Sequence, residues 1–389
     1  MALLPLSAFF DPNAPSADFF SWQFLQLVGR NLAPGVRPGL VALAACLALT
    51  PLTIWGARRA GFLAHPSRDR DIHTRPVAYG GGLAMFAAFA IACLLFLRHD
   101  ASLTGLLLLG GVTAAVFAID DRRGIPALVK LAIQAVLAVA AVELFGFQIH
   151  YLLVLPFLQI HDLGPLILPV TVFWILGMQN TVNLLDGVDG LAAGVVGITA
   201  VVLLVAAAGR QTDDVVPLAA ALAAVCAGFL VFNFNPARIF MGDSGAYFLG
   251  LMLALLSVAG VAKVAIVAAI AVPVLAMALP IADTAFSIVR RRSSGQSVAH
   301  ADAKHIHHLL LEAGLSQRQT CILFYCVSGI LGAIGLTVFG HRKILAVVIV
   351  LMVVVLSTVL GERLRTSRSR IRVPFGRVLR ELLVGREPA

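Results

Sequence analysis

Two aspartates lie between two long apolar runs of this chain, an unusual place for negative charge. The stretch NTVNLLDGVDGLAAG places Asn183, Asp186 and Asp189 at intervals of three residues, so the three side chains share one face if the turn is helical. In the middle of a bilayer each aspartate would cost about 2.5–3.5 kcal/mol, so we expect both at its rim or in a wet cavity. Asp189 can also be explained as the N-cap of the next helix.

A second acidic pair, Asp120 and Asp121, closes another apolar run in the stretch FAIDDRRG. A helix C-terminus already carries partial negative charge, so carboxylates are unfavourable there unless a cation compensates them. The candidates are the arginines that follow the pair, Lys130, or a bound metal ion. Asp243, in FMGDSG, stands at the start of a further apolar run and between two glycines. This position is typical either of a helix N-cap or of a point where a ligand or ion approaches the backbone closely.

Histidines and arginines supply the positive counterpart of these acids. In HPSRDRDIHTRPVAYGGG, Arg70 and His73 precede a glycine-rich helix start, which suits phosphate groups but is equally explained as an ordinary basic loop. In ADAKHIHHLL, His305 and His308 share a helical face, and Asp302 lies three residues before His305. Such histidines can act as acid or base, bind anions when protonated, or bind zinc; the absence of an HEXXH motif argues against zinc.

The composition predicts that transmembrane helices hold these residues. Of 389 residues, 60% are hydrophobic and only 13% are charged, about half the charged fraction of a soluble domain. We therefore expect an all-α polytopic membrane protein with one integral-membrane domain (1–360) and a basic tail (361–389). Apolar runs predict about eleven spans: 38–57, 80–98, 102–119, 127–145, 165–182, 190–208, 214–232, 244–260, 262–289, 320–340 and 342–360.

The positive charges indicate how these spans are oriented. Most of the 29 Lys and Arg fall on the loops of one side and in the tail, which the positive-inside rule makes cytoplasmic, with the N-terminus periplasmic and the C-terminus cytoplasmic. The polar clusters fall on the same side, and Asp283, shortly before a run of three arginines, belongs to it as well. We read the net charge of +9 as contact with anionic membrane lipids, and not with nucleic acid.

Together the clusters favour one class of reaction. A single membrane face gathers carboxylates, an asparagine, basic residues and three histidines, without a Walker-type phosphate loop. Oxygen ligands suit Mg²⁺ and basic side chains suit phosphates, so the site favours a reaction between a water-soluble phosphate donor and a lipid acceptor. Two other classes stay open. A transporter would spread its charges through the depth of the spans and contain inverted repeats, and a scaffold would leave the carboxylates unexplained.

Over residues 60–325 the chain resembles the polyprenyl-phosphate N-acetylhexosamine-1-phosphate transferase family, glycosyltransferase family 4. Five ordered elements carry the resemblance: P…R..H..P….GG from Pro66, DD at Asp120, N..NL.DG.DGLA.G from Asn180, FN..PA..FMGD.G ending at Gly245, and P..DT…RR…G.S…AD..H.HH ending at His308. The stretch HIHHLLLEAGLSQRQ is most similar to the N-acetylglucosamine-1-phosphate branch. The phospho-N-acetylmuramoyl-pentapeptide branch, which we keep as an alternative, usually has three adjacent histidines, and here Ile306 interrupts them.

The resemblance implies Mg²⁺-dependent transfer, with Mn²⁺ as a substitute. A UDP-N-acetylhexosamine, foremost UDP-N-acetylglucosamine, would donate its sugar phosphate to undecaprenyl phosphate and release UMP, which initiates a cell-envelope polysaccharide. The enzyme would lie in the bacterial inner membrane as a homodimer, with its site on the cytoplasmic side. The resemblance implies that Asn183 and Asp243 bind the metal ion, that Asp120 and Asp121 place the metal or accept a proton, and that Asp186 and Asp189 position the donor. It implies that the sugar phosphate is bound by His305, His307 and His308. The other residues expected to contact substrate are Arg70, His73, Lys130, Asn180, Asp283 and Asp302.

Overall fold

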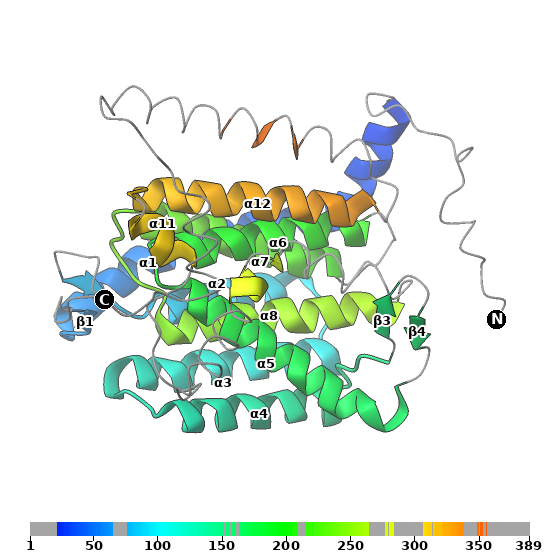
Figure 1. Ribbon diagram of the computed structural model, residues 1–389, viewed down its shortest axis with the longest axis horizontal. Helices are drawn as coiled ribbons and strands as arrows, with labels where there is room; N and C mark the ends of the chain where they lie inside the picture. Colours follow the sequence, from blue (N-terminus) through cyan, green and yellow to red (C-terminus); the bar gives the residue numbers. More distant parts are fainter. Residues whose placement is uncertain are drawn as a thin grey trace, which may run out of the picture.

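Long helices packed side by side make up nearly all of the described structure (Figure 1). The computed structural model describes residues 22–64, 76–150, 152–155, 158–160, 163–208, 215–263, 277–278, 280–283, 306–312, 314–337, 348–349, 351–352 and 355. The helices are α1 (Trp22–Arg59), α2 (Gly81–Phe96), α3 (Ala101–Arg123), α4 (Ala127–Glu143), η2 (Gly164–Leu166), α5 (Ile167–Leu185), α6 (Leu191–Ala208), α7 (Val215–Asn233), α8 (Gly242–Lys263), α11 (Ile306–Glu312) and α12 (Gln317–Thr337). The strands β1 (Leu63–Ala64), β2 (Val77–Ala78), β3 (Leu152–Leu155) and β4 (Leu158–Ile160) form two antiparallel hairpins, β1–β2 and β3–β4.

Seven described helices are long and apolar enough to cross a bilayer: Gly29–Arg59, Ala101–Arg123, Gly164–Leu185, Leu191–Ala208, Val215–Asn233, Gly242–Ala259 and Gln317–Leu336. They confirm the prediction of a helical polytopic membrane protein. The predicted spans 80–98 and 127–145 correspond to α2, which is apolar but shorter, and to α4. The spans 262–289 and 342–360 and the tail lie mostly outside the described residues, so the count of eleven and the orientation of the termini stay predictions.

Helix α8 lies at the centre of the bundle, with α2, α3, α5, α6 and α7 packed around it. Its side chains from Ala246 to Leu256 are all buried. Glycine makes one of these contacts close: a Cβ atom at Gly250 would lie 2.6 Å from the Cα atom of Gln179 in α5. Helix α8 is therefore held by neighbours on several sides, which makes it a rigid support for a site.

The glycine run before α2 serves packing. The N–H groups of Gly81 and Gly82 donate to the carbonyl oxygens of Phe240 (3.1 Å) and Met241 (3.2 Å), just before α8. A Cβ atom at Gly82 would lie 2.2 Å from the backbone nitrogen of Gly245, so only glycine allows α2 to begin this close to α8. These two N–H groups are already bonded, so the phosphate-binding role expected for this helix start does not fall to them.

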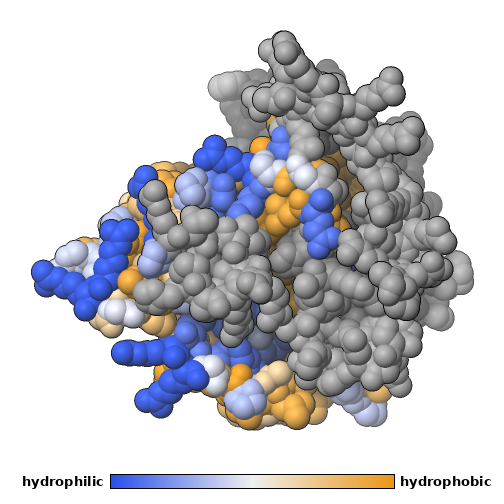
Figure 2. Space-filling model, turned by 60° about the vertical axis from the view of Figure 1, so that its left-hand side comes forward, coloured by the Kyte–Doolittle hydropathy of each residue, from blue (hydrophilic) through white to orange (hydrophobic). Residues whose placement is uncertain are grey.

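The two hairpins mark opposite ends of the bundle (Figure 1). The β3–β4 hairpin joins the end of α4 to the start of α5. Lys130, near the start of α4, and Asn183, near the end of α5, therefore lie at the other end, the end of β1–β2. Figure 2 turns that end forward and shows hydrophilic residues gathered beside apolar flanks, as expected where a membrane-embedded bundle meets water.

Candidate active site

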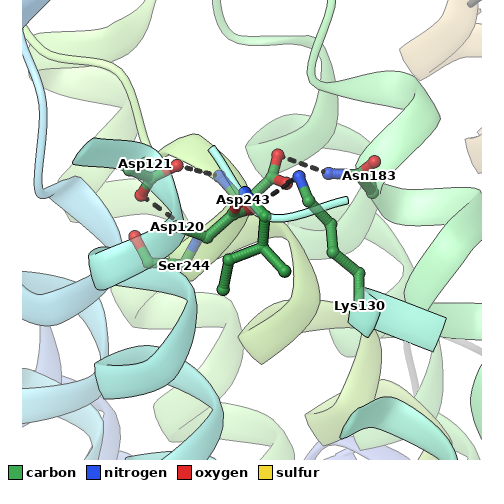
Figure 3. Close-up of polar contacts among 7 residues, drawn as sticks. Asp120, Asp121, Lys130, Asn183, Asp243 and Ser244 are labelled. Carbon is green, nitrogen blue, oxygen red and sulfur yellow. Dashed lines mark hydrogen bonds and ion pairs between the residues drawn. The ribbon is translucent and has the colours of Figure 1, made fainter. Parts of the chain in front are cut away.

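Asp243, in the first turn of α8, is the centre of a polar cluster (Figure 3). Its Oδ1 atom accepts a hydrogen bond from Asn183 Nδ2 (2.9 Å), and its Oδ2 atom lies 2.5 Å from Lys130 Nζ. Lys130 Nζ also lies 2.6 Å from Asp120 Oδ2. The four residues come from α8, α5, α4 and α3, so the fold brings together side chains from four separate segments of the sequence.

The orientation of the Asn183 amide follows from its partner. The Asp243 carboxylate can only accept a hydrogen bond when ionised, so Asn183 presents its amide nitrogen to it. The amide oxygen of Asn183 consequently faces away from Asp243 (Figure 3). Asn183 thus combines a donor that holds Asp243 with an oxygen of the kind that binds divalent cations.

Asp121 holds the start of α8 from the neighbouring helix α3. Its carboxylate accepts the N–H groups of Asp243 (2.7 Å) and Ser244 (3.3 Å). Gly242 makes this approach possible, since its φ angle is +68° and a Cβ atom there would lie 2.5 Å from Asp121 Oδ2. Asp121 therefore supplies the N-terminal cap that was considered for Asp243.

Asp120, the other member of the pair, faces the cluster instead. It is buried, its Oδ1 atom accepts the N–H of Ile125, and its Oδ2 atom pairs with Lys130. The sequence left several cations that could balance the negative charge at the end of α3, and in the structure Lys130 balances that of Asp120. Adjacent aspartates thus have different tasks because successive positions on a helix point in different directions.

Asp186 and Asp189 both lie in the short connection between the end of α5 and the start of α6. Burial raises the pKa of Asp186 well above its usual range, and the negative charges of Asp243, Asp121 and Asp189 raise it further; the N–H of Gly242 opposes them. Asp186 therefore belongs electrostatically to the cluster around Asp243.

Asp189 binds the loop after α7. Its Oδ2 atom accepts the side-chain amide of Asn235 (3.0 Å) and the N–H of Ala237 (3.0 Å), so the N-cap role considered for it is not the one seen. Helix α12 reinforces this loop, because Gln317 Oε1 accepts a hydrogen bond from Asn235 Nδ2 (2.9 Å) and Arg318 Nε donates to the carbonyl of Asn235 (2.8 Å). Neither Gln317 nor Arg318 was identified as a site residue from the sequence, where both look like ordinary polar residues at a helix start.

The donor set of the cluster fits a divalent cation, although no metal centre is preformed. Among the described residues, no three His, Cys, Asp or Glu side chains are arranged to hold a metal ion. Asp120, Asp121, Asp186 and Asp243 nevertheless lie near one another, and Lys130 forms ion pairs with two of them, Asp120 and Asp243. The ligands are oxygens, which are those that Mg²⁺ prefers, and a bound cation would favour the ionised form of Asp186.

Comparison with known proteins finds a family whose model covers the segment that carries this site. The family model for glycosyl transferase family 4 matches residues 103–261, which run from α3 into α8 and include the whole cluster around Asp243. A probable undecaprenyl-phosphate N-acetylglucosaminyl 1-phosphate transferase of Bacillus subtilis is 31% identical over 327 residues, 83% of this chain and 90% of that protein. The chain belongs to glycosyl transferase family 4. It is a transferase with several apolar helices fit to span a membrane.

Two further relatives show the range of the similarity. A decaprenyl-phosphate N-acetylglucosaminephosphotransferase of Mycolicibacterium smegmatis is 33% identical to the transferase over 359 residues, 81% of this chain and 87% of that protein. A phospho-N-acetylmuramoyl-pentapeptide-transferase of a Synechococcus strain is 35% identical over 217 residues, which is 55% of this chain and 63% of that protein. The similarity to the second kind of enzyme is thus confined to a shorter segment.

The remaining predicted residues of the transferase lie outside this cluster or outside the described residues. Asn180 donates to Gln134 Oε1 (2.7 Å) and to the carbonyl of Leu176, and buried Asp283 accepts the N–H of Ile306 (3.0 Å) at the start of α11. The residues that lie outside the described part of the chain are Arg70, His73, Asp302 and His305, together with the side chains of His307 and His308.

Proposed function

We propose that this transferase moves N-acetylglucosamine 1-phosphate from UDP-N-acetylglucosamine to undecaprenyl phosphate and releases UMP. The observation that carries the proposal is the meeting of Asp120, Lys130, Asn183 and Asp243 at one end of a bundle of apolar helices. A lipid phosphate reaches such a site from the bilayer and a nucleotide sugar reaches it from water. The names of the relatives that match most of the chain support both the lipid acceptor and the sugar.

A divalent cation, Mg²⁺ or Mn²⁺, completes the site in this proposal. Asp243 and the amide oxygen of Asn183 would hold it, with Asp120 nearby and with Asp186 ionising when the cation binds. When bound, the cation supplies charge neutralisation for the diphosphate and for the departing UMP. Lys130, which bridges Asp120 and Asp243 in the structure, would then be available to a phosphate group.

The reaction forms one phosphorus–oxygen bond and breaks another. An oxygen of the lipid phosphate attacks the sugar-bearing phosphorus of the donor, and the bond from that phosphorus to the UMP oxygen breaks. In this proposal Asp120 takes a proton from the lipid phosphate, because its Oδ2 atom faces Lys130 in the cluster, whereas the carboxylate of Asp121 is turned to the start of α8. Most of the catalysis then comes from positioning and electrostatic stabilisation.

The remaining predicted residues keep their expected roles as part of the proposal. Asp186 and Asp189 position the donor, and Asn180 and Asp283 contribute to substrate binding, directly or through the contacts described above. The residues expected to bind the sugar phosphate and other phosphate groups are Arg70, His73, Asp302, His305, His307 and His308.

The sugar assignment rests on how far the similarity extends. The two N-acetylglucosamine transferases described above match over 87–90% of their own length, and the muramoyl-pentapeptide enzyme matches over 63%. Ile306, which separates His305 from His307, also favours N-acetylglucosamine over the muramoyl-pentapeptide substrate. We also propose that the site faces the cytoplasm, where the basic loops are expected and where nucleotide sugars are made.

UMP release tests the proposal directly. Purified transferase with undecaprenyl phosphate and Mg²⁺ should release UMP fastest from UDP-N-acetylglucosamine, more slowly from UDP-N-acetylgalactosamine and UDP-MurNAc-pentapeptide, and not at all with EDTA. Asp243→Ala should abolish turnover while the protein is still extracted folded. Asp100→Ala is the matched control, because Asp100 caps α3 by accepting the N–H of Leu103 (2.7 Å) and belongs to no part of the cluster. No UMP from any of the three donors would refute the function.

A further inference from the structure

A second layer of side chains lies one helical turn below the cluster around Asp243. Each of the four helices carries a member of both layers, three or four residues apart and so on one face. The pairs, with the residue of the upper layer first, are Asp120 and Phe117 on α3, Lys130 and Gln134 on α4, Asn183 and Asn180 on α5, and Asp243 and Tyr247 on α8.

Gln134 contacts two other members of the lower layer, Asn180 and Tyr247. Its Oε1 atom accepts a hydrogen bond from Asn180 Nδ2 (2.7 Å). Asn180 Nδ2 also donates to the carbonyl of Leu176 (2.8 Å), and because a carbonyl can only accept, this second bond fixes the direction of the Asn180 amide. The side chain of Tyr247 interacts with Gln134, and its ring packs against Phe117 with 4.3 Å between the centroids.

Three members of this layer are buried and Asn180 is half-buried, whereas in the layer above it only Asp120 is buried. Gln134 is 1% exposed and Tyr247 is 4% exposed, against 22% for the side chain of Lys130 and 27% for that of Asp243. A buried amide without a partner costs free energy, so the Gln134–Asn180 bond strongly favours one rotation of α4 against α5. That rotation points Lys130 and Asn183 at Asp243.

We propose that Gln134 is a positioning residue for the cation site: it touches neither substrate nor ion, and it holds α4, α5 and α8 so that Lys130, Asn183 and Asp243 meet. The identity of the cation rests on the proposed function, but the arrangement of the two layers does not. Partners that orient metal ligands typically change metal affinity or activity by about 10- to 100-fold when they are removed.

Metal binding without nucleotide or lipid tests this inference. Gln134→Met keeps the length of the side chain and removes its polar atoms, and Mn²⁺ binding to the full-length purified protein is followed by electron paramagnetic resonance. We expect Gln134→Met to bind Mn²⁺ about 10- to 100-fold more weakly than the wild type. The control is Ser257→Ala, which removes a partly buried hydrogen bond between α5 and α8, from Trp174 Nε1 to Ser257 Oγ (3.0 Å), far along α8 from Asp243. This control should lower thermal stability and leave Mn²⁺ affinity unchanged.

The inference is overturned if Gln134→Met binds Mn²⁺ as the wild type does, if Ser257→Ala weakens binding equally, or if the wild type does not bind Mn²⁺ at all. Should Gln134→Met not be extracted folded, Asn180→Ala removes the same bond from the other side and must give the same loss of affinity. A wild type that binds Mn²⁺ in a Gln134-dependent manner but releases no UMP would refute the proposed function and leave this inference standing.

Discussion

Lys130 Nζ lies 2.5 Å from Asp243 Oδ2, and the same ammonium group lies 2.6 Å from Asp120 Oδ2. One positive charge from α4 therefore joins the acid at the end of α3 to the acid at the start of α8. Without it, the buried carboxylate of Asp120 and the partly buried carboxylate of Asp243 would lie close together without a cation, which is strongly unfavourable. Lys130 thus occupies a place where a second cation would compete for the same oxygens.

Replacing Lys130 with Met should destabilise the metal-free transferase and increase its response to metal. The pair is partly exposed, so we expect a loss of about 1–3 kcal/mol, less than for a fully buried pair. Added Mg²⁺ should raise the melting temperature of Lys130→Met more than that of the wild type, because the metal replaces the lost charge. Thermal unfolding in detergent with and without Mg²⁺ measures both effects. An equal Mg²⁺ response in the two proteins would contradict the competition.

Replacing Asp120 with Asn and replacing Asp121 with Asn should change different kinetic parameters of the transferase. Asp120→Asn removes a group placed to take a proton, so we expect kcat to fall by about 10²- to 10⁴-fold even at saturating Mg²⁺. Asp121→Asn keeps one acceptor for the start of α8, so it should raise the Mg²⁺ concentration needed for half-maximal rate and lower kcat by less than the first variant. Steady-state rates over a Mg²⁺ series separate the two. Equal losses of kcat with unchanged Mg²⁺ dependence would show that the pair acts as one unit.

Asp186 should make the metal-free protein less stable as the pH rises. Its pKa is raised in the folded state, so the folded state holds a proton that the unfolded chain releases above the ordinary aspartate pKa of about 3.9. Stability is therefore fully present below that value and is lost as the pH rises towards the raised pKa. Asp186→Asn removes this cost, so metal-free Asp186→Asn should be more stable than the wild type at pH 8 and nearly equal at low pH. Parallel melting curves for both proteins across the pH range would disprove the assignment.

Gly82→Ala should disturb the contact between α2 and α8, whereas Gly177→Ala should not. A Cβ atom at Gly82 would lie 2.2 Å from the backbone of Gly245, and nothing lies within 4 Å of the same position at Gly177 in α5. We expect Gly82→Ala to cost about 1–3 kcal/mol and to reduce turnover, since the shift occurs two residues from Asp243. Gly177→Ala should stabilise α5 by up to about 1 kcal/mol. Similar stability of the two variants would mean that α2 and α8 separate easily.

Much of the architecture could be predicted because hydropathy depends on the chain alone. The spans 102–119, 190–208 and 214–232 agree closely with α3, α6 and α7, since apolar runs of this length have few other stable states in a bilayer. The start of helix α1 was predicted wrongly: the helix begins at Trp22, well before the predicted residue 38, because it includes Pro34 and Pro38 without ending at them. The site acids could also be found, because each interrupts or borders an apolar run where charge is costly.

The sequence by itself determined that Asp120, Asn183 and Asp243 lie near the ends of apolar helices, and the order of the helices then sets them at one end of the bundle. Only the tertiary structure decided that Asp121 caps α8 while Asp120 meets Lys130, and that Gln134 supports the site from below. The reason is physical: charge and hydropathy act on each segment separately, whereas the partner of a hydrogen bond depends on how far one helix is rotated against another, and that angle is set by packing across the whole bundle.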